Sequence, residues 1–343
     1  GFTSGSMQEG MSYEVCGVSP DAIVASLDGN GASADLITYW IGYNATYLNS
    51  YMQYYGGGAL DWDYVMSDGT AMPDYIKQDV LATVKQELLI ENLAKKYGVT
   101  LTDEQRAAIE SEEQSFIEQY GSEEAFEEEL AKLGLRRETY ERITSANYLY
   151  QNLYKLYLTE GSALYASNED LAAYAAAQGY ITADHILLTT VDTATGEALS
   201  DEAIAEKKAL AEELAEKLKN YTGDDLASYF AELADEYSED PGRASNPSGY
   251  TFTTGSMVQE FEDAAYALDE GAVSDIVESR FGYHILLRLP LDKTAAAETV
   301  REDYFSNFID EQMDKAKTAT SAEYDKLDAK ALYEAIVAAQ AEG

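Results

Sequence analysis

Cysteine and histidine are almost absent from this chain. It contains one cysteine, Cys16, and two histidines, His185 and His284, among 343 residues. A single cysteine excludes an internal disulfide framework and a cysteine-rich zinc site. No third histidine and no nearby cysteine completes a set of metal ligands around the two imidazoles. We therefore expect neither a metal site nor a cofactor.

Basic residues are also scarce. The chain has 23 Lys and Arg against 63 Asp and Glu, which gives a formal net charge of −40. Such a surface repels phosphates and anionic lipid headgroups, and this disfavours nucleic acid and acidic membranes as partners. Basic or unfolded polypeptide is a better electrostatic match. We interpret the long acidic runs as the solvated faces of helices.

Long apolar segments are missing too. No stretch approaches the roughly 20 apolar residues that cross a bilayer, so we expect a soluble chain. The first 17 residues, GFTSGSMQEGMSYEVCG, have neither a basic region nor an apolar core of the kind that signal peptides carry. Any leader or anchor is thus expected outside the given residues. The Gly- and Ser-rich residues 1–20 are expected to form a flexible lead-in.

A tyrosine stripe dominates the first helical segment. Tyrosines recur every fourth residue and the run ends at GGG, 56–58, which predicts one helix with an aromatic face. Two interpretations are open: the face packs between helices, or it is an exposed aromatic surface that binds client polypeptides. The residues of the stripe are Tyr39, Tyr43, Tyr47, Tyr51 and Tyr55.

Helical patterns continue on both sides of a central segment. Residues 73–98 predict an amphipathic helix with proline in its first turn and glycine at its end. Similar patterns extend through 160, so 33–178 is expected to be all-α. The pattern returns over 294–341, where an amphipathic helix needs a partner. We therefore predict one discontinuous helical domain, residues 21–178 plus 292–343.

The central segment, 179–291, has a different texture. A short strand-like run at 180–190 is followed by two helical patterns, a Pro/Gly/Ser/Asn loop, a short helix and two more strand-like runs. This order over about 110 residues is typical of a compact α+β module with a small mixed or antiparallel sheet flanked by helices. The fold class predicted for the whole chain is α+β, with this module inserted in an all-α domain.

Both histidines lie in near-identical apolar pentapeptides, DHILL at 184–188 and YHILL at 283–287. If the two segments are neighbouring strands, alternation of side chains can place both imidazoles on one face, side by side. Paired imidazoles can hydrogen-bond to each other, so that the tautomer of one fixes the tautomer of the other. On these residues alone, a satisfied pair of core histidines and a catalytic pair both remain open.

The residues around the second histidine resemble the C-terminal half of a parvulin-type peptidyl-prolyl cis/trans isomerase. The resemblance covers 237–289, and ADHILL resembles the family's first strand. The matching motifs follow one another in the family's order: SED at 238–240, GSMVQEFEDAAYAL at 255–268, GAVSDIV at 271–277 and FGYHILLR at 281–288.

The resemblance implies a catalytic network of four residues. His185 and His284 match the family's two facing histidines. Asp240 matches a Cys or Asp position near the twisting amide, and Ser279 matches a hydroxyl of the same hydrogen-bond network.

The resemblance also implies a pocket for the proline ring. Met257 and Phe261 match its apolar floor. The sequence departs from the family at NPSGYTF, where Gly249 stands at a position usually held by a leucine of the pocket wall. Tyr250 and Phe252 are the expected replacements.

The implied reaction is rotation about an Xaa-Pro bond, whose barrier is roughly 18–20 kcal/mol. It breaks no bond and requires neither nucleophile nor metal; an apolar slot for the ring and polar groups that favour the twisted amide suffice. Phosphate-directed parvulins carry a basic cluster after the first strand. Residues 189–202 contain four acids and no base here, so we expect no preference for phosphorylated substrates.

The flanking helices resemble the chaperone domain of extracytoplasmic parvulin foldases of the PrsA and SurA type, and the single module favours the PrsA type. This resemblance implies work outside the cytoplasmic membrane, at the cell surface or secreted, on unfolded exported proteins that contain Xaa-Pro. A lipid anchor outside the given chain and a homodimer through the helical domain are compatible with it.

YEVC is a poor lipid-attachment sequence, so Cys16 is interpreted as an incidental thiol. The alternative function is a holdase or surface-binding protein with a catalytically weak module.

Overall fold

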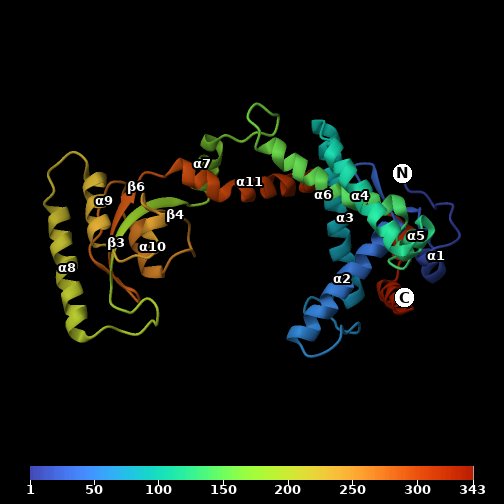
Figure 1. The fold of residues 1–343 in the computed structure, drawn as a ribbon, viewed down its shortest axis with the longest axis horizontal. Helices are drawn as coiled ribbons and strands as arrows, with labels where there is room; N and C mark the ends of the chain where they lie inside the picture. The colour runs from blue at the N-terminus through green and yellow to red at the C-terminus, as the bar shows by residue number, and fades with distance from the viewer. Residues whose placement is uncertain (343) are drawn as a thin grey trace. The chain divides into compact units, whose positions relative to one another are not determined.

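The chain divides into two compact units in the computed structural model, which describes residues 1–342. The helical unit comprises residues 1–165 and 307–343, and the sheet unit comprises residues 166–306. The sheet unit is thus inserted in the sequence of the helical unit, and Figure 1 shows the elements of each. Within the described residues, no helix is both long and apolar enough to cross a membrane.

The helical unit is built around α3, which packs against α2, α6 and α13. Its buried residues Ile76, Val80, Val84 and Leu88 recur every four positions, so they form one stripe that faces the neighbouring helices. Pro73 lies in the first turn of α3, and Gly98 ends it in the left-handed conformation. The helices are α2 (Ala34–Tyr55), α3 (Met72–Tyr97), α4 (Asp103–Tyr120), α5 (Glu123–Ala131), α6 (Arg137–Tyr157), α12 (Ala322–Asp325) and α13 (Ala329–Ala341).

The helical unit also contains a sheet, which corrects the expectation that it is all-α. Strands β1 (Ile23–Leu27), β2 (Asn30–Ser33) and β7 (Thr318–Thr320) form it in the order β2-β1-β7. Asp28 and Gly29 connect β1 to β2 with positive φ angles of 48° and 85°. An Asp-Gly pair at this position is the sequence signal of a tight hairpin.

Residues 1–20 form ordered contacts in the structure, although a flexible lead-in was expected. They include the short helix α1 (Met11–Cys16), and Thr3 pairs with Ile23 beside β1. The Asp21 carboxylate accepts hydrogen bonds from the backbone N–H groups of Ser6 and Met7. Helix α1 also packs against α13 and α2, and Val18 is fully buried. Tertiary contacts therefore order a segment whose composition alone indicates flexibility.

The sheet unit has four antiparallel strands in the order β4-β3-β6-β5. Helices α8 and α9 contact β3 and β6. Helix α10 contacts β5 and β6 from the face that carries Ala183 and Leu286 (Figure 1). The bounds are β3 (Ile181–Thr189), β4 (Tyr250–Phe252), β5 (Val277–Ser279), β6 (Gly282–Leu289), α8 (Asp201–Lys219), α9 (Leu226–Tyr237) and α10 (Gln259–Ala267).

Two further helices extend the sheet unit beyond the residues 179–291 expected for the module. These are α7 (Asn168–Ala177) and the first part of α11 (Lys293–Lys315). The Tyr174 hydroxyl donates to Asp303 Oδ2 at 2.8 Å, and the Asp292 N–H donates to Thr182 Oγ1 of β3 at 2.9 Å. These contacts place the unit boundaries at 165/166 and 306/307.

A half-buried carboxyl group lies among the helices of the helical unit. Burial, and next the negative charge of Glu91, raise the pKa of Glu87 to about 7, although Arg142 opposes the shift. Because the folded state then binds the proton more tightly than the unfolded chain, ionisation of Glu87 opposes folding. This cost is absent below the ordinary value of 4.5 and is complete above about pH 7.

We predict that Glu87→Gln stabilises the helical unit at pH 8 by on the order of 2 kcal/mol, and that the gain disappears below about pH 4.5. Urea unfolding followed by tryptophan fluorescence measures this directly, because Trp40 and Trp62, the chain's two tryptophans, both lie in the helical unit. The exposed Glu118→Gln is the control. A gain that does not change with pH would contradict the assignment.

Candidate active site

The two histidines lie on the two central strands of the sheet. Strand β3 pairs with β6 so that His185 lies opposite Leu286 and Leu187 lies opposite His284. The imidazoles are therefore diagonal neighbours on one face, and their Nδ1 atoms are 3.2 Å apart. Both side chains are buried and their rings are inclined by only 15°. The placement expected from the repeated HILL segments is confirmed.

The imidazole pair continues at both ends into polar side chains. His185 Nε2 lies 3.0 Å from Asp240 Oδ2, and His284 Nε2 lies 2.7 Å from Ser279 Oγ. The structure thus brings together all four residues predicted for the network. Tyr250 extends it, because its hydroxyl donates to the same oxygen of Asp240 at 2.6 Å. The result is one continuous chain of hydrogen bonds from Ser279 to Tyr250.

Burial and hydrogen bonding fix the charges in this chain. Burial alone would raise the pKa of Asp240, but hydrogen bonds with His185, Tyr250 and the Gly242 N–H hold it well below its usual range. Burial, together with the nearby His185, lowers the pKa of His284 to about 4. Near neutral pH, Asp240 is therefore a carboxylate and His284 an uncharged imidazole.

These charges determine the direction of every hydrogen bond when His185 is also uncharged. An ionised Asp240 only accepts, so His185 donates from Nε2 and its Nδ1 is an acceptor. His284 must then donate from Nδ1, which leaves its Nε2 to accept the Ser279 hydroxyl hydrogen. Each donor hydrogen of the network is therefore bonded to an acceptor within the network, and each bond points toward Asp240.

A recess of about 740 Å³, lined by both apolar and polar side chains, adjoins the network on the α10 face of the sheet. Met257 and Phe261 line it as predicted, and the Phe261 ring lies 5.0 Å from the His185 ring and 5.8 Å from the His284 ring, centroid to centroid. Leu187 and Phe281 complete the apolar wall. The recess can hold a small apolar ring directly beside the hydrogen-bonded chain.

The wall residues expected near the departure NPSGYTF fall in different places. Tyr250 lines the recess, whereas Phe252 is buried and packs behind Phe261, with ring centroids 5.5 Å apart. Gly249 has a φ of 95°, and a Cβ there would lie 2.7 Å from the Ala183 carbonyl oxygen. A larger residue therefore has no room at this position.

An ion pair that the sequence analysis missed anchors the loop that carries Asp240. Arg243 Nη1 lies 2.7 Å from Oδ1 of Asp184, a buried residue of β3. The same oxygen accepts the His185 N–H at 2.8 Å. Asp184 precedes His185 in DHILL, and Arg243 closely follows Asp240. These two opposite charges, each near a predicted site residue, were the sequence signal for the ion pair.

A second missed residue shapes the recess. Glu262 is buried in the first turn of α10, and its carboxylate accepts the N–H groups of Gly255 and Met257 at 3.1 and 2.9 Å. It thereby fixes the loop that carries Met257. Glu262, the second acid of EFEDAA, was the sequence signal for this contact, because a carboxylate in the first turn of a helix can accept hydrogen bonds from preceding N–H groups.

The predicted client-binding tyrosines lie on α2. Tyr39 is half-buried, whereas Tyr43, Tyr47, Tyr51 and Tyr55 are exposed, with Tyr47 at 68%. Tyr54 adds a fifth exposed ring at 81%, and it contacts Tyr55 with ring centroids 4.7 Å apart. The stripe is therefore mostly surface in the described chain.

Metal ligation was not expected at the histidine pair. Across residues 1–342, no group of three or more His, Cys, Asp or Glu side chains is arranged to hold a metal ion.

We predict that His284 titrates with a midpoint near pH 4 and is the Nδ1–H tautomer at pH 7, because Asp240 and His185 orient the chain. Long-range ¹H–¹⁵N NMR of the imidazoles distinguishes the tautomers, and a chain with only two histidines gives an unambiguous spectrum. His284→Asn identifies its signals. A neutral His284 with its proton on Nε2 would contradict the proposed direction of the bonds.

Comparison with known proteins places this site in a family. The family model of the PPIC-type PPIASE domain, Rotamase, matches residues 185–289. Foldase protein PrsA of Geobacillus sp. (strain WCH70) is 38% identical over 120 residues, which are 35% of this chain and 43% of that protein. Chaperone SurA of Chromohalobacter salexigens is 35% identical over 113 residues, 31% of this chain and 25% of that protein.

Solved structures give broader but weaker matches. The crystal structure of PrsA from Bacillus subtilis is 21% identical and covers 94% of this chain and 93% of its own, with a TM-score of 0.27. The isomerase PrsA from Bacillus anthracis is 24% identical over 69% of this chain and 94% of its own, with a TM-score of 0.24. These scores are too low to support an inference.

The two curated relatives match over less than half of their own length. The matched family region includes both histidines, Asp240, the recess and Ser279. The chain therefore contains a PPIC-type, or parvulin, peptidyl-prolyl isomerase domain over residues 185–289.

Proposed function

We propose that this chain is an extracytoplasmic foldase that catalyses cis/trans isomerisation of Xaa-Pro bonds in unfolded exported proteins. One observation carries the proposal. Within the PPIC-type domain, the continuous chain from Ser279 to Asp240 borders the same recess that Met257 and Phe261 line. A proline ring held on the apolar floor would place its amide beside the network.

The geometry suggests how rotation is favoured. A planar amide is stabilised by resonance, and catalysis must bind the twisted form more tightly. The network's protons are used internally, so with neutral histidines it offers no free donor to hold the planar carbonyl. The apolar floor formed by Met257 and Phe261 then disfavours the more polar planar form relative to water. His185, Asp240, Ser279 and His284 are the residues that we assign to this environment.

Unphosphorylated substrates fit the charges of this domain. The segment between β3 and α8 carries Asp192 and Glu197 and no basic residue. Residues 180–291 contain seven basic and 23 acidic side chains, a formal net charge of −16. A phosphate would therefore meet repulsion near the first helix of the domain.

The helical unit is proposed to hold client chains. Its α2 exposes a row of tyrosines, and exposed aromatic rings bind apolar and polar parts of a polypeptide alike. This observation also supports the alternative function, a holdase or surface-binding protein whose parvulin module is catalytically weak. The names PrsA and SurA of the relatives favour a site of action outside the cytoplasmic membrane. A lipid anchor and a homodimer remain proposals.

We predict that Met257→Ala in the whole chain lowers kcat/KM for Xaa-Pro peptides at least tenfold, because the ring loses its floor. Asp240→Asn should cause a loss of similar size, since an amide accepts more weakly than a carboxylate and turns an NH2 donor toward either the Gly242 N–H or the His185 and Tyr250 donors. Protease-coupled or NMR exchange measurements with Xaa varied give the rates. Met313→Ala, in the helical unit, is the matched control.

Wild-type rates indistinguishable from the uncatalysed reaction, in a chain with native circular dichroism, would favour the holdase function instead.

We predict that Tyr47→Ser with Tyr54→Ser weakens suppression of client aggregation and leaves peptide isomerisation unchanged. Both rings are mainly exposed, so their loss should change stability little. The concentration required for half-maximal suppression of light scattering by a reduced, unfolding client should rise at least threefold. Tyr120→Ser with Tyr165→Ser is the control. Unchanged suppression by the α2 variant would move client binding elsewhere.

A further inference from the structure

Helix α4 buries one residue, and that residue is a glutamate. Of its 18 residues, only Glu113 is buried, with 6% of its surface exposed. The apolar residues Ile109, Phe116 and Ile117 on the same helix are only half-buried. A buried carboxylate is costly unless it is fully paired. Helix α4 thus buries a charged residue more deeply than its apolar residues, and the neighbouring helices must explain why.

A recess of about 600 Å³ lies where α4 meets α3 and α6. Its apolar walls come from all three helices and from the loop between α3 and α4, and Glu113 and Glu141 also line it. The loop is fixed, because Asn152 Nδ2 donates to the Thr100 carbonyl oxygen at 3.0 Å. The apolar lining residues are Ala94, Val99, Leu101, Ile109 and Leu149.

Glu113 is only half satisfied. Its Oε2 accepts a hydrogen bond from Arg137 Nη2 at 3.0 Å. Its Oε1 is buried, and no donor within residues 1–342 bonds it. Burial raises the pKa of the neighbouring Glu141, and a side-chain hydrogen bond with Glu113 raises it further. The two carboxyl groups can thus share a proton, or a cation can replace that proton between them.

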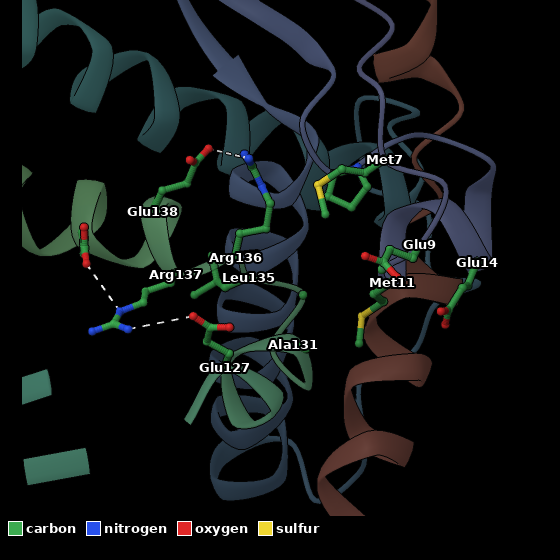
Figure 2. Close-up of a pocket in the computed structure, with 14 residues that line it drawn as sticks. Met7, Glu9, Met11, Glu14, Glu127, Ala131, Leu135, Arg136, Arg137 and Glu138 are labelled. Carbon is green, nitrogen blue, oxygen red and sulfur yellow. Dashed lines mark hydrogen bonds and ion pairs between the residues drawn. The ribbon is translucent and has the colours of Figure 1, made fainter. Parts of the chain in front are cut away.

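The local charges leave room for another cation. Arg137 alone faces Glu113, Glu123, Glu127 and Glu141, with its guanidinium 3.6 Å from Glu141 and 3.9 Å from Glu127. Figure 2 shows Arg137 on the wall of the adjacent cavity, linked to Glu127.

The other charges at the recess do not supply this cation. Arg106 is paired with Asp103, and Glu91 is paired with Arg142. Lys95 and Glu110 are exposed. No ion pair joins Lys95 or Arg106 to Glu113 in the described chain, and Arg137 bonds only its Oε2. No cation of the described chain therefore bonds Glu113 Oε1.

We propose that the recess between α3, α4 and α6 binds an arginine side chain, flanked by apolar residues, of a non-native polypeptide. A guanidinium is planar and can donate to Glu113 Oε1 and to Glu141 together. Its methylene stem and an apolar neighbour would cover Ile109 and Leu149. This would be a client contact in the helical unit, independent of the isomerase site.

Fluorescence anisotropy of a labelled 14-residue peptide tests the proposal with the whole chain. The peptide has a Leu-Arg-Leu core in a Gly/Ser context and contains no proline, so it does not probe the isomerase site. Its partner has citrulline, the uncharged isostere, in place of arginine. We expect Glu113→Gln to weaken binding of the arginine peptide at least tenfold, while Glu112→Gln, an exposed neighbour with the same change in charge, leaves it within twofold.

Citrulline should weaken binding to the wild type to a similar extent and abolish the effect of Glu113→Gln. Ile109→Trp, which fills the recess and keeps both carboxyl groups, covers the case in which Glu113→Gln does not fold; it should abolish binding, and Ala108→Trp should not. Equal binding of the two peptides, undetectable binding of the arginine peptide, or binding unaffected by Ile109→Trp would overturn the proposal and leave a shared proton as the partner of Glu113.

Discussion

The antiparallel pairing of β3 with β6 is the constraint on which the candidate site depends. It places His185 and His284 on one face with their Nδ1 atoms 3.2 Å apart. A slip of one residue in either strand would turn its histidine to the face covered by α8 and α9. Ile186 and Ile285 occupy that opposite face and are fully buried, so the same alternation that buries them fixes the imidazoles.

The ends of the polar chain depend on less regular structure. Ser279 lies at the end of β5, and Asp240 lies in the loop after α9. This loop follows β3 closely: the Glu239 N–H donates to the Leu187 carbonyl oxygen at 2.7 Å, and Ser238 Oγ accepts the Leu187 N–H. Together with the Arg243–Asp184 ion pair, these bonds hold Asp240 beside the His185 ring, although the loop that carries Asp240 is not part of a strand. Buried polar groups are thereby satisfied in pairs, which favours a single arrangement of the site.

Periodicity and motif order predicted most of what the structure contains. The four-residue spacing in α3 and the HILL repeats each follow from one dominant contact, burial of an apolar face, and such patterns are visible along the chain. Phe252 shows the limit, since whether an aromatic residue lines a recess or supports another ring depends on strand register. The β2-β1-β7 sheet was missed because its strands are short and because β7 lies far from β1 in the sequence, with Ala25 paired to Thr320. Glu113 was missed because an acidic helix reads as a solvated face.

The isomerase site and the α4 recess treat buried acids in opposite ways. Asp240 accepts from His185, Tyr250 and Gly242, so its carboxylate is satisfied within the fold and its pKa lies below the usual range. Glu113 has one donor to one oxygen, and its neighbour Glu141 has a raised pKa. A fully paired acid is a component of rigid structure, whereas a buried acid with a free oxygen retains binding energy for a group from outside. In a chain with a net charge of −40, acids are too common to be informative individually. Their hydrogen-bond partners are what separates a structural carboxylate from one that can recognise a ligand.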